Sequence, residues 1–135
     1  MGEQGAESKN DSLRVELTKV WETEKGFLKT PECATFDAQR NIFYVSKLNR
    51  DTETENDGFI SLVNVDGSVK IERWVEGLTS PLGNYYNKEH LYVKDGGNII
   101  KIEIESGKII ERFAVEGASS LNGIDIDEAG NIYAA

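Results

Sequence analysis

Cysteine, histidine and proline are scarce in this sequence, and the long apolar runs of membrane proteins are missing. The chain of 135 residues contains one cysteine, one histidine and two prolines. A lone Cys33 excludes an internal disulfide and any zinc site or thiol relay built on a CxxC pair, and we expect it to be a buried, unreactive side chain. The apolar runs are far shorter than the roughly twenty residues that span a bilayer. This composition predicts a globular protein.

Positive charge is also in short supply. Fifteen Lys and Arg residues stand against twenty-four Asp and Glu residues, which gives a net charge of -9. Such a chain repels the phosphates of nucleic acids and of anionic lipids, and it lacks the counterion release that drives non-specific nucleic-acid binding. The sequence therefore argues against nucleic acids and membranes as partners.

The N-terminus lacks the hydrophobic core of a signal peptide. It begins MGEQGAESKNDS, which is polar throughout. We expect residues 1–11 to form a flexible tail and residues 12–135 to form one domain, because a chain of this length fits a single domain. A mature terminus left after signal removal has the same polar character, so a periplasmic and a cytoplasmic location are both compatible with it.

An internal repeat organises the rest of the chain. The stretch VEGLTSPLGNYY at 75–86 aligns without a gap with VEGASSLNGIDI at 115–126, forty residues later. The same offset pairs residues 58–75 with residues 98–115. A third, partial copy begins at Pro31, where PECATFDAQRNIFYVS resembles PLGNYYNKEHLYVKD. Repeats of this period indicate an architecture built from stacked units.

Each unit consists of short runs rich in Val, Ile, Tyr and Phe, bounded by Gly, Asn and Asp. Gly67 in VDGS and Gly107 in ESGK lie where a tight hairpin needs a positive φ. The pattern predicts antiparallel strands and no helices. We expect strands at 32–37, 41–46, 58–64 and 69–75, at 82–86, 90–94, 98–104 and 108–115, and at 122–127 and 131–135.

Four-stranded units at this spacing are typical of propeller blades. We therefore predict an all-β fold, namely a partial β-propeller with about two complete four-stranded antiparallel blades and the start of a third. The alternating segment SLRVELTKVW at 12–21 predicts an N-terminal edge strand. The final stretch LNGIDIDEAGNIYAA stops inside an inner hairpin, and an open sheet edge tends to recruit another chain. We expect a portion of a larger ring, or self-association through the open sheet edges.

Four stretches carry a resemblance to a known family. They are PECATFDAQRNIFYVS, GFISLVNVDGSV, HLYVKDGGNIIKIEIESGKI and SSLNGIDIDEAGNIYAA. Over about residues 31–135 the chain resembles the senescence marker protein and gluconolactonase family, and it is also similar to NHL-type repeats. The resemblance implies a six-bladed propeller with a divalent metal, calcium or zinc, near the central axis. Several members of that family hydrolyse sugar lactones.

The resemblance also implies two metal ligands. In that family a Glu early in the first blade and an Asn in a PNG-like turn help to hold the metal, and Glu32 in PECA and Asn122 in LNGI match them. Carboxylate and amide oxygens suit a hard divalent cation. The alternative is that both are strand-end residues that bond to nearby backbone. Cys33 replaces the family's Gly-Pro, Leu82 replaces a ligand in the second unit, and the catalytic Asp has no counterpart, so no catalytic residue is assigned.

Other polar and aromatic features have structural explanations. The acidic stretch RDTETENDG at 50–58 departs from the EF-hand pattern and is better explained as a solvated insertion. His90 lies at a predicted strand start without a nucleophile motif, so we expect a structural role. Tyr85 and Tyr86 are expected to pack between blades, with stacking on a sugar as the alternative.

Two functional hypotheses follow. The first is a metal-dependent hydrolase of the lactonase type that acts on a sugar lactone or another small molecule, with its catalytic base outside this sequence. The second is a non-catalytic propeller that binds a protein or a glycan through loops on one face, including residues 47–57. A propeller scaffold supports both classes.

Overall fold

The computed structural model describes residues 14–28, 30–48 and 57–135. Within these ranges the chain forms ten β-strands and no helix, so none of the described residues belongs to a helix that could cross a membrane. The predicted all-β class is confirmed. The expected tail at 1–11 lies outside the described residues.

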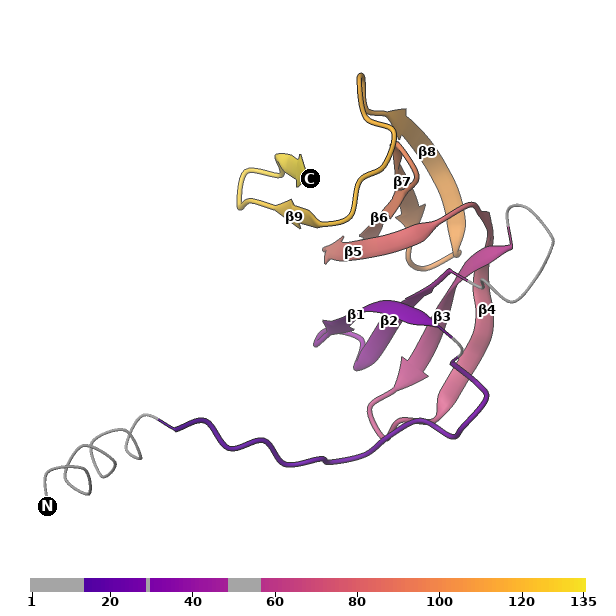
Figure 1. The fold of residues 1–135 in the computed structure, drawn as a ribbon, viewed down its shortest axis with the longest axis vertical. Coiled ribbons are helices and arrows are strands. Elements are labelled where there is room, and N and C mark those ends of the chain that lie inside the picture. Colours follow the sequence, from indigo (N-terminus) through magenta and orange to yellow (C-terminus); the bar gives the residue numbers. More distant parts are fainter. Residues whose placement is uncertain (1–13, 29, 49–56) are drawn as a thin grey trace, which may run out of the picture.

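Two four-stranded antiparallel sheets and one hairpin follow one another along the chain (Figure 1). Each sheet keeps its strands in sequence order, so the predicted meanders are confirmed as two blades and the start of a third. The strands closely match the predicted ranges. They are β1 (Pro31–Asp37), β2 (Ile42–Lys47), β3 (Gly58–Asn64) and β4 (Val69–Leu78) in the first blade, β5 (Pro81–Asn87), β6 (His90–Asp95), β7 (Asn98–Glu103) and β8 (Lys108–Ala114) in the second, and β9 (Ile124–Ile126) and β10 (Ile132–Ala134) in the third unit.

The repeat is present in the backbone as well as in the sequence. Gly67 and Gly107 turn the β3–β4 and β7–β8 hairpins with φ of 89° and 68°. Gly77 and Gly117, also forty residues apart, share a φ of 77°. Residues with a Cβ rarely adopt this left-handed conformation. Because both units have glycine at the equivalent positions, the backbone of each unit turns at the same place.

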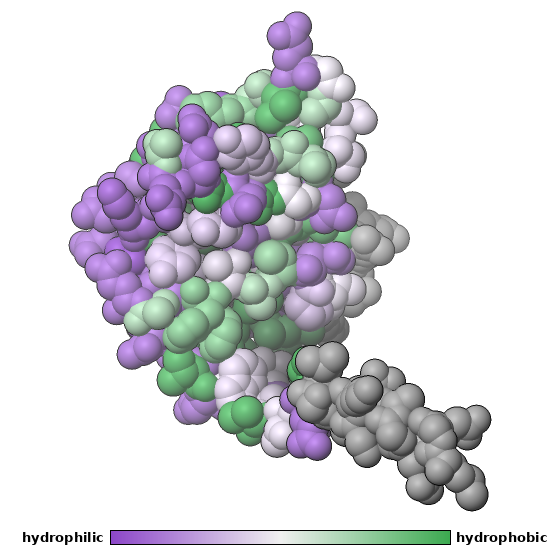
Figure 2. All heavy atoms as spheres, turned by 90° about the vertical axis from the view of Figure 1, so that its left-hand side faces the viewer, coloured by the Kyte–Doolittle hydropathy of each residue, from purple (hydrophilic) through white to green (hydrophobic). Residues whose placement is uncertain are grey.

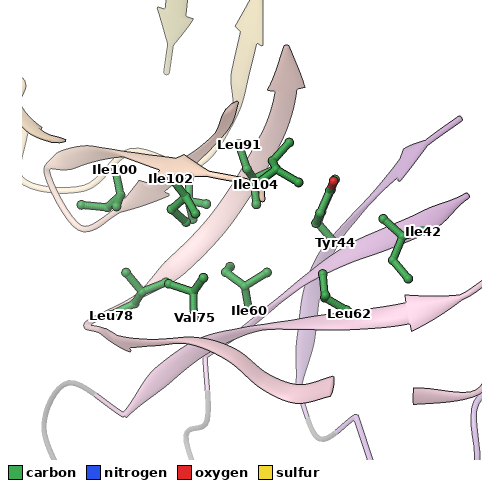
Figure 3. Close-up of a cluster of buried hydrophobic side chains, with 11 residues drawn as sticks. Ile42, Tyr44, Ile60, Leu62, Val75, Leu78, Leu91, Ile100, Ile102 and Ile104 are labelled. Carbon is green, nitrogen blue, oxygen red and sulfur yellow. The ribbon is translucent and has the colours of Figure 1, made fainter. Parts of the chain in front are cut away.

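The main core lies between the two blades (Figure 3). Tyr44, Ile60 and Leu78 of the first blade face Val93 and Ile100 of the second, and all five are fully buried. Burying an apolar side chain of this size contributes about 1.5–3 kcal/mol, so burial at this interface stabilises the stacking of the two blades.

The innermost strands β1, β5 and β9 lie beside one another on the left of Figure 1. Thr35 Oγ1 donates a hydrogen bond of 2.9 Å to the Asn84 carbonyl, and the Gly83 N–H donates one of 3.0 Å to the Asn122 carbonyl. These bonds link each unit to the next along the innermost strands. Seen from this side, hydrophilic residues follow one margin and hydrophobic residues gather lower down (Figure 2).

The N-terminal segment differs from the prediction. Residues 14–24 are not part of any strand, although an edge strand was expected at 12–21. Val15, Leu17 and Val20 are 83%, 94% and 85% exposed. A strand exists only as a partner of another strand, and this segment pairs with none of the described strands.

Candidate functional site

The two predicted metal ligands lie at the starts of innermost strands. Glu32 is the second residue of β1, and Asn122 comes two residues before β9. Both are exposed. Strand β5 lies between β1 and β9, and Leu82 of β5 is half-buried there. The next residue after Glu32, the lone Cys33, is half-buried rather than buried as predicted.

Glu32 and Asn122 do not form a complete metal site by themselves. The backbone of Asn122 is used in the fold, because its N–H donates to the Ala135 carbonyl at 2.6 Å and its carbonyl accepts from Gly83. No group of three or more His, Cys, Asp or Glu residues converges anywhere in residues 14–28, 30–48 and 57–135. A divalent cation needs more ligands than these two oxygens, so metal binding stays a prediction.

The buried carboxylate of Asp95 has a structural role near the same end. Asp95 is 3% exposed, and its two carboxylate oxygens accept hydrogen bonds from the N–H groups of Thr79 and Ser80. These two residues form the connection from β4 to β5. Asp95 therefore fixes the passage of the chain from the first blade to the second.

A second buried carboxylate, that of Asp37, organises the opposite end of the first blade. Its Oδ1 accepts from the N–H groups of Gln39 and Arg40 in the β1–β2 turn, each at 3.0 Å. Its Oδ2 accepts from the Tyr44 hydroxyl at 2.6 Å and from Arg40 Nη1 at 3.0 Å. Arg40 Nη1 also donates to the Lys88 carbonyl at 2.9 Å, so the network reaches the second blade.

This network shifts the titration of its members. Burial by itself raises the pKa of Asp37, but the hydrogen bonds from Tyr44 and Arg40 outweigh it and hold the pKa below its usual value. Burial, followed by the hydrogen bond to Asp37, raises the pKa of the Tyr44 hydroxyl. Asp37 is therefore an anion and Tyr44 a neutral donor at neutral pH.

A cleft of about 490 Å³ opens between the two blades, next to this network. It lies at the end of the blades where the β1–β2, β3–β4 and β7–β8 turns lie. Its floor consists of the buried side chains of Ile42, Tyr44, Leu62 and Ile104. These four residues belong to the core between the blades, so the cleft is the open end of that core (Figure 3).

The walls of the cleft are aromatic and its rim is charged. Trp74 stacks on Tyr44, with ring centroids 5.7 Å apart and an angle of 30° between the planes. Arg40, Lys70 and Glu105 form the rim. The cleft thus combines an aromatic wall with donors and an acceptor from two turns and from the start of β4. We call it the interblade cleft.

The other predicted residues lie elsewhere. His90 is half-buried at the start of β6, and its ring lies 6.4 Å from that of Tyr92. Tyr85 and Tyr86 line a smaller cleft of about 310 Å³ between the second blade and the third unit. Of the acidic stretch at 50–58, residues 50–56 lie outside the described residues, and Asp57 accepts a 2.9 Å hydrogen bond from Arg73 Nη1.

Sequence reasoning did not find the interblade cleft. Arg40 and Glu105 lie in two different turns and Lys70 lies at the start of β4, so the three form no motif along the chain. The available signal was the repeat itself, because residues at equivalent turns of adjacent blades come together when the blades stack.

Comparisons with known proteins give no family for this chain. No family model matches it, and no curated protein matches it. The crystal structure of a nidogen/laminin complex is 17% identical over 73% of this chain, with a TM-score of 0.37, and this chain spans 52% of that one. The computationally designed Ika4 protein is 13% identical, with 88% of this chain and 98% of that chain covered and a TM-score of 0.39. Similarities this weak carry no argument about function.

Proposed function

We propose that this chain is a non-catalytic β-propeller segment that binds a neutral glycan in the interblade cleft. The observation that carries the proposal is the make-up of the cleft. Its volume of about 490 Å³ and its buried apolar floor match ligand pockets, which measure roughly 300–1,000 Å³ and are mostly apolar with a few placed polar groups.

The charges at the rim favour a ligand rich in hydroxyl groups. Lys70 and Arg40 only donate hydrogen bonds, and the Glu105 carboxylate only accepts them. A sugar hydroxyl does both, and the apolar C–H face of a sugar ring stacks well on an indole such as that of Trp74. An anionic ligand would meet Glu105 and a cationic ligand would meet Arg40 and Lys70, so a neutral sugar fits best.

The buried carboxylates support binding rather than catalysis. Asp37 and Asp95 accept hydrogen bonds from turn and loop backbone, which ties both to the fold. A general acid or base must instead reach the substrate.

Titration calorimetry with short neutral oligosaccharides tests the proposal. We expect saturable binding, weakened about tenfold by Lys70→Gln or Glu105→Gln, because a hydrogen bond to a charged group contributes about 1.5 kcal/mol. Lys108→Gln, on exposed β8, is the matched control and should leave binding unchanged. In a Trp21→Phe background, Trp74 fluorescence should respond to the sugar. Absence of saturable binding across a panel of hexose and pentose oligomers overturns the proposal.

A second candidate is metal-dependent hydrolysis of sugar lactones by a protein that includes this chain. It rests on the resemblance to the senescence marker protein and gluconolactonase family. The supporting observation is that Glu32 and Asn122 both lie at the starts of innermost strands. In this proposal they supply two oxygen ligands for calcium or zinc, and the remaining ligands and the catalytic base come from other blades.

The two candidates are separable because they use opposite ends of the first blade. Glu32 begins β1, whereas Arg40 follows the end of β1. The hydrolase candidate predicts saturable calcium or zinc binding that Glu32→Gln abolishes, with glycan binding unchanged. Metal titration that gives the same isotherm for the wild type and Glu32→Gln rules this candidate out.

A further inference from the structure

The N-terminal segment contacts the first blade as β4 contacts the second. In the second blade, Gly107 of the β7–β8 turn lies against Trp74 of β4, and a Cβ placed there would be 2.9 Å from the indole Nε1. In the first blade, the equivalent Gly67 lies against Trp21, and a Cβ would be 2.6 Å from the indole Cε3. Trp21 therefore occupies, relative to the first blade, the place that Trp74 occupies relative to the second.

This equivalence assigns a position to the whole segment. Trp74 belongs to the outer strand of the blade that precedes the second blade, so Trp21 marks the outer strand of a blade that would precede the first. The sequence gives looser support, because SLRVE at 12–16 resembles SVKIE at 68–72, where β4 begins, but Trp21 follows its stretch after four residues and Trp74 follows its stretch after one. We call residues 14–24 the N-terminal arm.

The arm and the first blade have an unfilled space between them. A cleft of about 280 Å³ lies there, and its wall from the blade includes Phe43, Val45 and Val63. Trp21 covers part of it, with its ring edge-on to Phe43 at 5.6 Å. Val15, Leu17 and Val20 of the arm remain 83%, 94% and 85% exposed. This is the surface of a blade interface from which the inner strands are missing.

The third unit has the strands that this surface lacks. Its hairpin β9–β10 corresponds to the two inner strands of a blade, and Tyr133 on its outward face is 59% exposed. Units of this chain already stack in one repeated way, first blade on second and second blade on third unit. The next contact in that series would place the third unit of one copy on the open face of the first blade of another.

We propose that the chain self-associates head to tail in this way. The hairpin β9–β10 of one copy lies on Phe43 and Val45 of the next copy, and the N-terminal arm of that next copy forms the outer part of the same blade. Such a heterologous contact forms a closed ring when the rotations that relate successive units add up to a full turn, as they do in a propeller. A dimer is the smallest ring of this kind.

The repeated bond between inner strands specifies where the copies meet. Thr35 of β1 bonds to the Asn84 carbonyl of β5. By the repeat, Asp125 is equivalent to Thr35 and Ala34 is equivalent to Asn84, and both are exposed in one copy. Asp125 of one copy should therefore lie beside Ala34 of the next.

Sedimentation velocity and cysteine cross-linking test this assembly. We expect a mass at least twice the 15.0 kDa of one chain, and oxidation of an Ala34→Cys, Asp125→Cys, Cys33→Ala variant should join copies covalently. Leu17→Asp should raise the concentration needed for assembly at least tenfold. The variant should still fold, because Leu17 is exposed in a single copy. Ile110→Asp on β8, at a residue 47% exposed, is the matched control and should leave the mass unchanged. A monomer at all concentrations together with no cross-linked product overturns the proposal.

Discussion

The Tyr44 hydroxyl donates a 2.6 Å hydrogen bond to Asp37 Oδ2, so the floor of the interblade cleft is tied to the carboxylate that holds the β1–β2 turn. The same oxygen accepts from Arg40, which reaches the second blade through the Lys88 carbonyl. The floor of the interblade cleft, the β1–β2 turn and the contact between blades therefore share one buried anion.

Replacement of that anion should destabilise the fold. Asp37→Asn removes a fully buried charge that has partners on both oxygens, and we expect the free energy of unfolding to fall by about 2–4 kcal/mol. Because the pKa of Asp37 is lowered in the folded state, its contribution is present above the unfolded value of about 3.9 and is lost as the pH falls through the folded pKa.

Urea denaturation at pH 7 and at pH 3 measures this effect. The wild type should lose more stability on acidification than Asp37→Asn does. Asp66→Asn provides a matched control, because the pKa of Asp66 is also lowered, but by Ser68 in an exposed turn. An equal loss in the wild type and Asp37→Asn would refute the assignment.

Gly83 should be essential for attaching the third unit. A Cβ at this residue would lie 2.4 Å from the Asn122 carbonyl, which accepts the Gly83 N–H. Gly83→Ala should therefore cost about 1–3 kcal/mol, and hydrogen exchange should accelerate in β9 and β10 while β1–β4 stay protected. Gly123→Ala, where nothing lies within 4 Å of the added Cβ, should change neither property.

Gly107 and Gly117 allow the Trp74 contact to be separated from backbone strain. Both have a positive φ, so alanine at either is strained by about 1–2 kcal/mol. Only at Gly107 does the Cβ also meet Trp74, because nothing lies within 4 Å at Gly117. Gly107→Ala should be the more destabilising change, and it alone should alter the near-ultraviolet circular dichroism of the Trp74–Tyr44 stack. Equal effects would show that Trp74 is not held by this turn.

The strands could be predicted from the sequence because their limits are set locally. The hairpin turns at Gly67 and Gly107 need a positive φ, which glycine adopts readily, so the two glycines mark where the turns occur. Between the turns, alternating Val and Ile residues indicate strands. The conformation of the N-terminal arm could not be predicted in the same way. Its alternating pattern is that of a strand, but a strand forms only when it pairs with the edge of a sheet, and that edge is distant in the sequence. The interblade cleft depends on how two blades stack, which the spacing of Arg40 and Glu105 along the chain does not encode.

Lys94 should reduce the stability of the fold at neutral pH. Its side chain is fully buried, and its Nζ has no hydrogen-bond partner among the described residues. Burial lowers the pKa of Lys94, although the nearby charge of Asp95 opposes the shift. The unfolded chain therefore binds more protons than the folded chain between the folded pKa and about 10.4, so stability should rise with pH across that interval.

Lys94→Met should remove this penalty, because methionine fills a similar volume without a charge. We expect a gain of about 1–3 kcal/mol at pH 7 and a flatter dependence of stability on pH between 7 and about 10. Lys101→Met is the matched control, since Lys101 is half-buried and its Nζ lies over the Tyr92 ring at 5.9 Å. That change should lose a cation–π contact and give no gain. If Lys94→Met instead lowers the free energy of unfolding, the Lys94 ammonium has a partner that stabilises it, and the residue belongs to a contact with another blade or another copy.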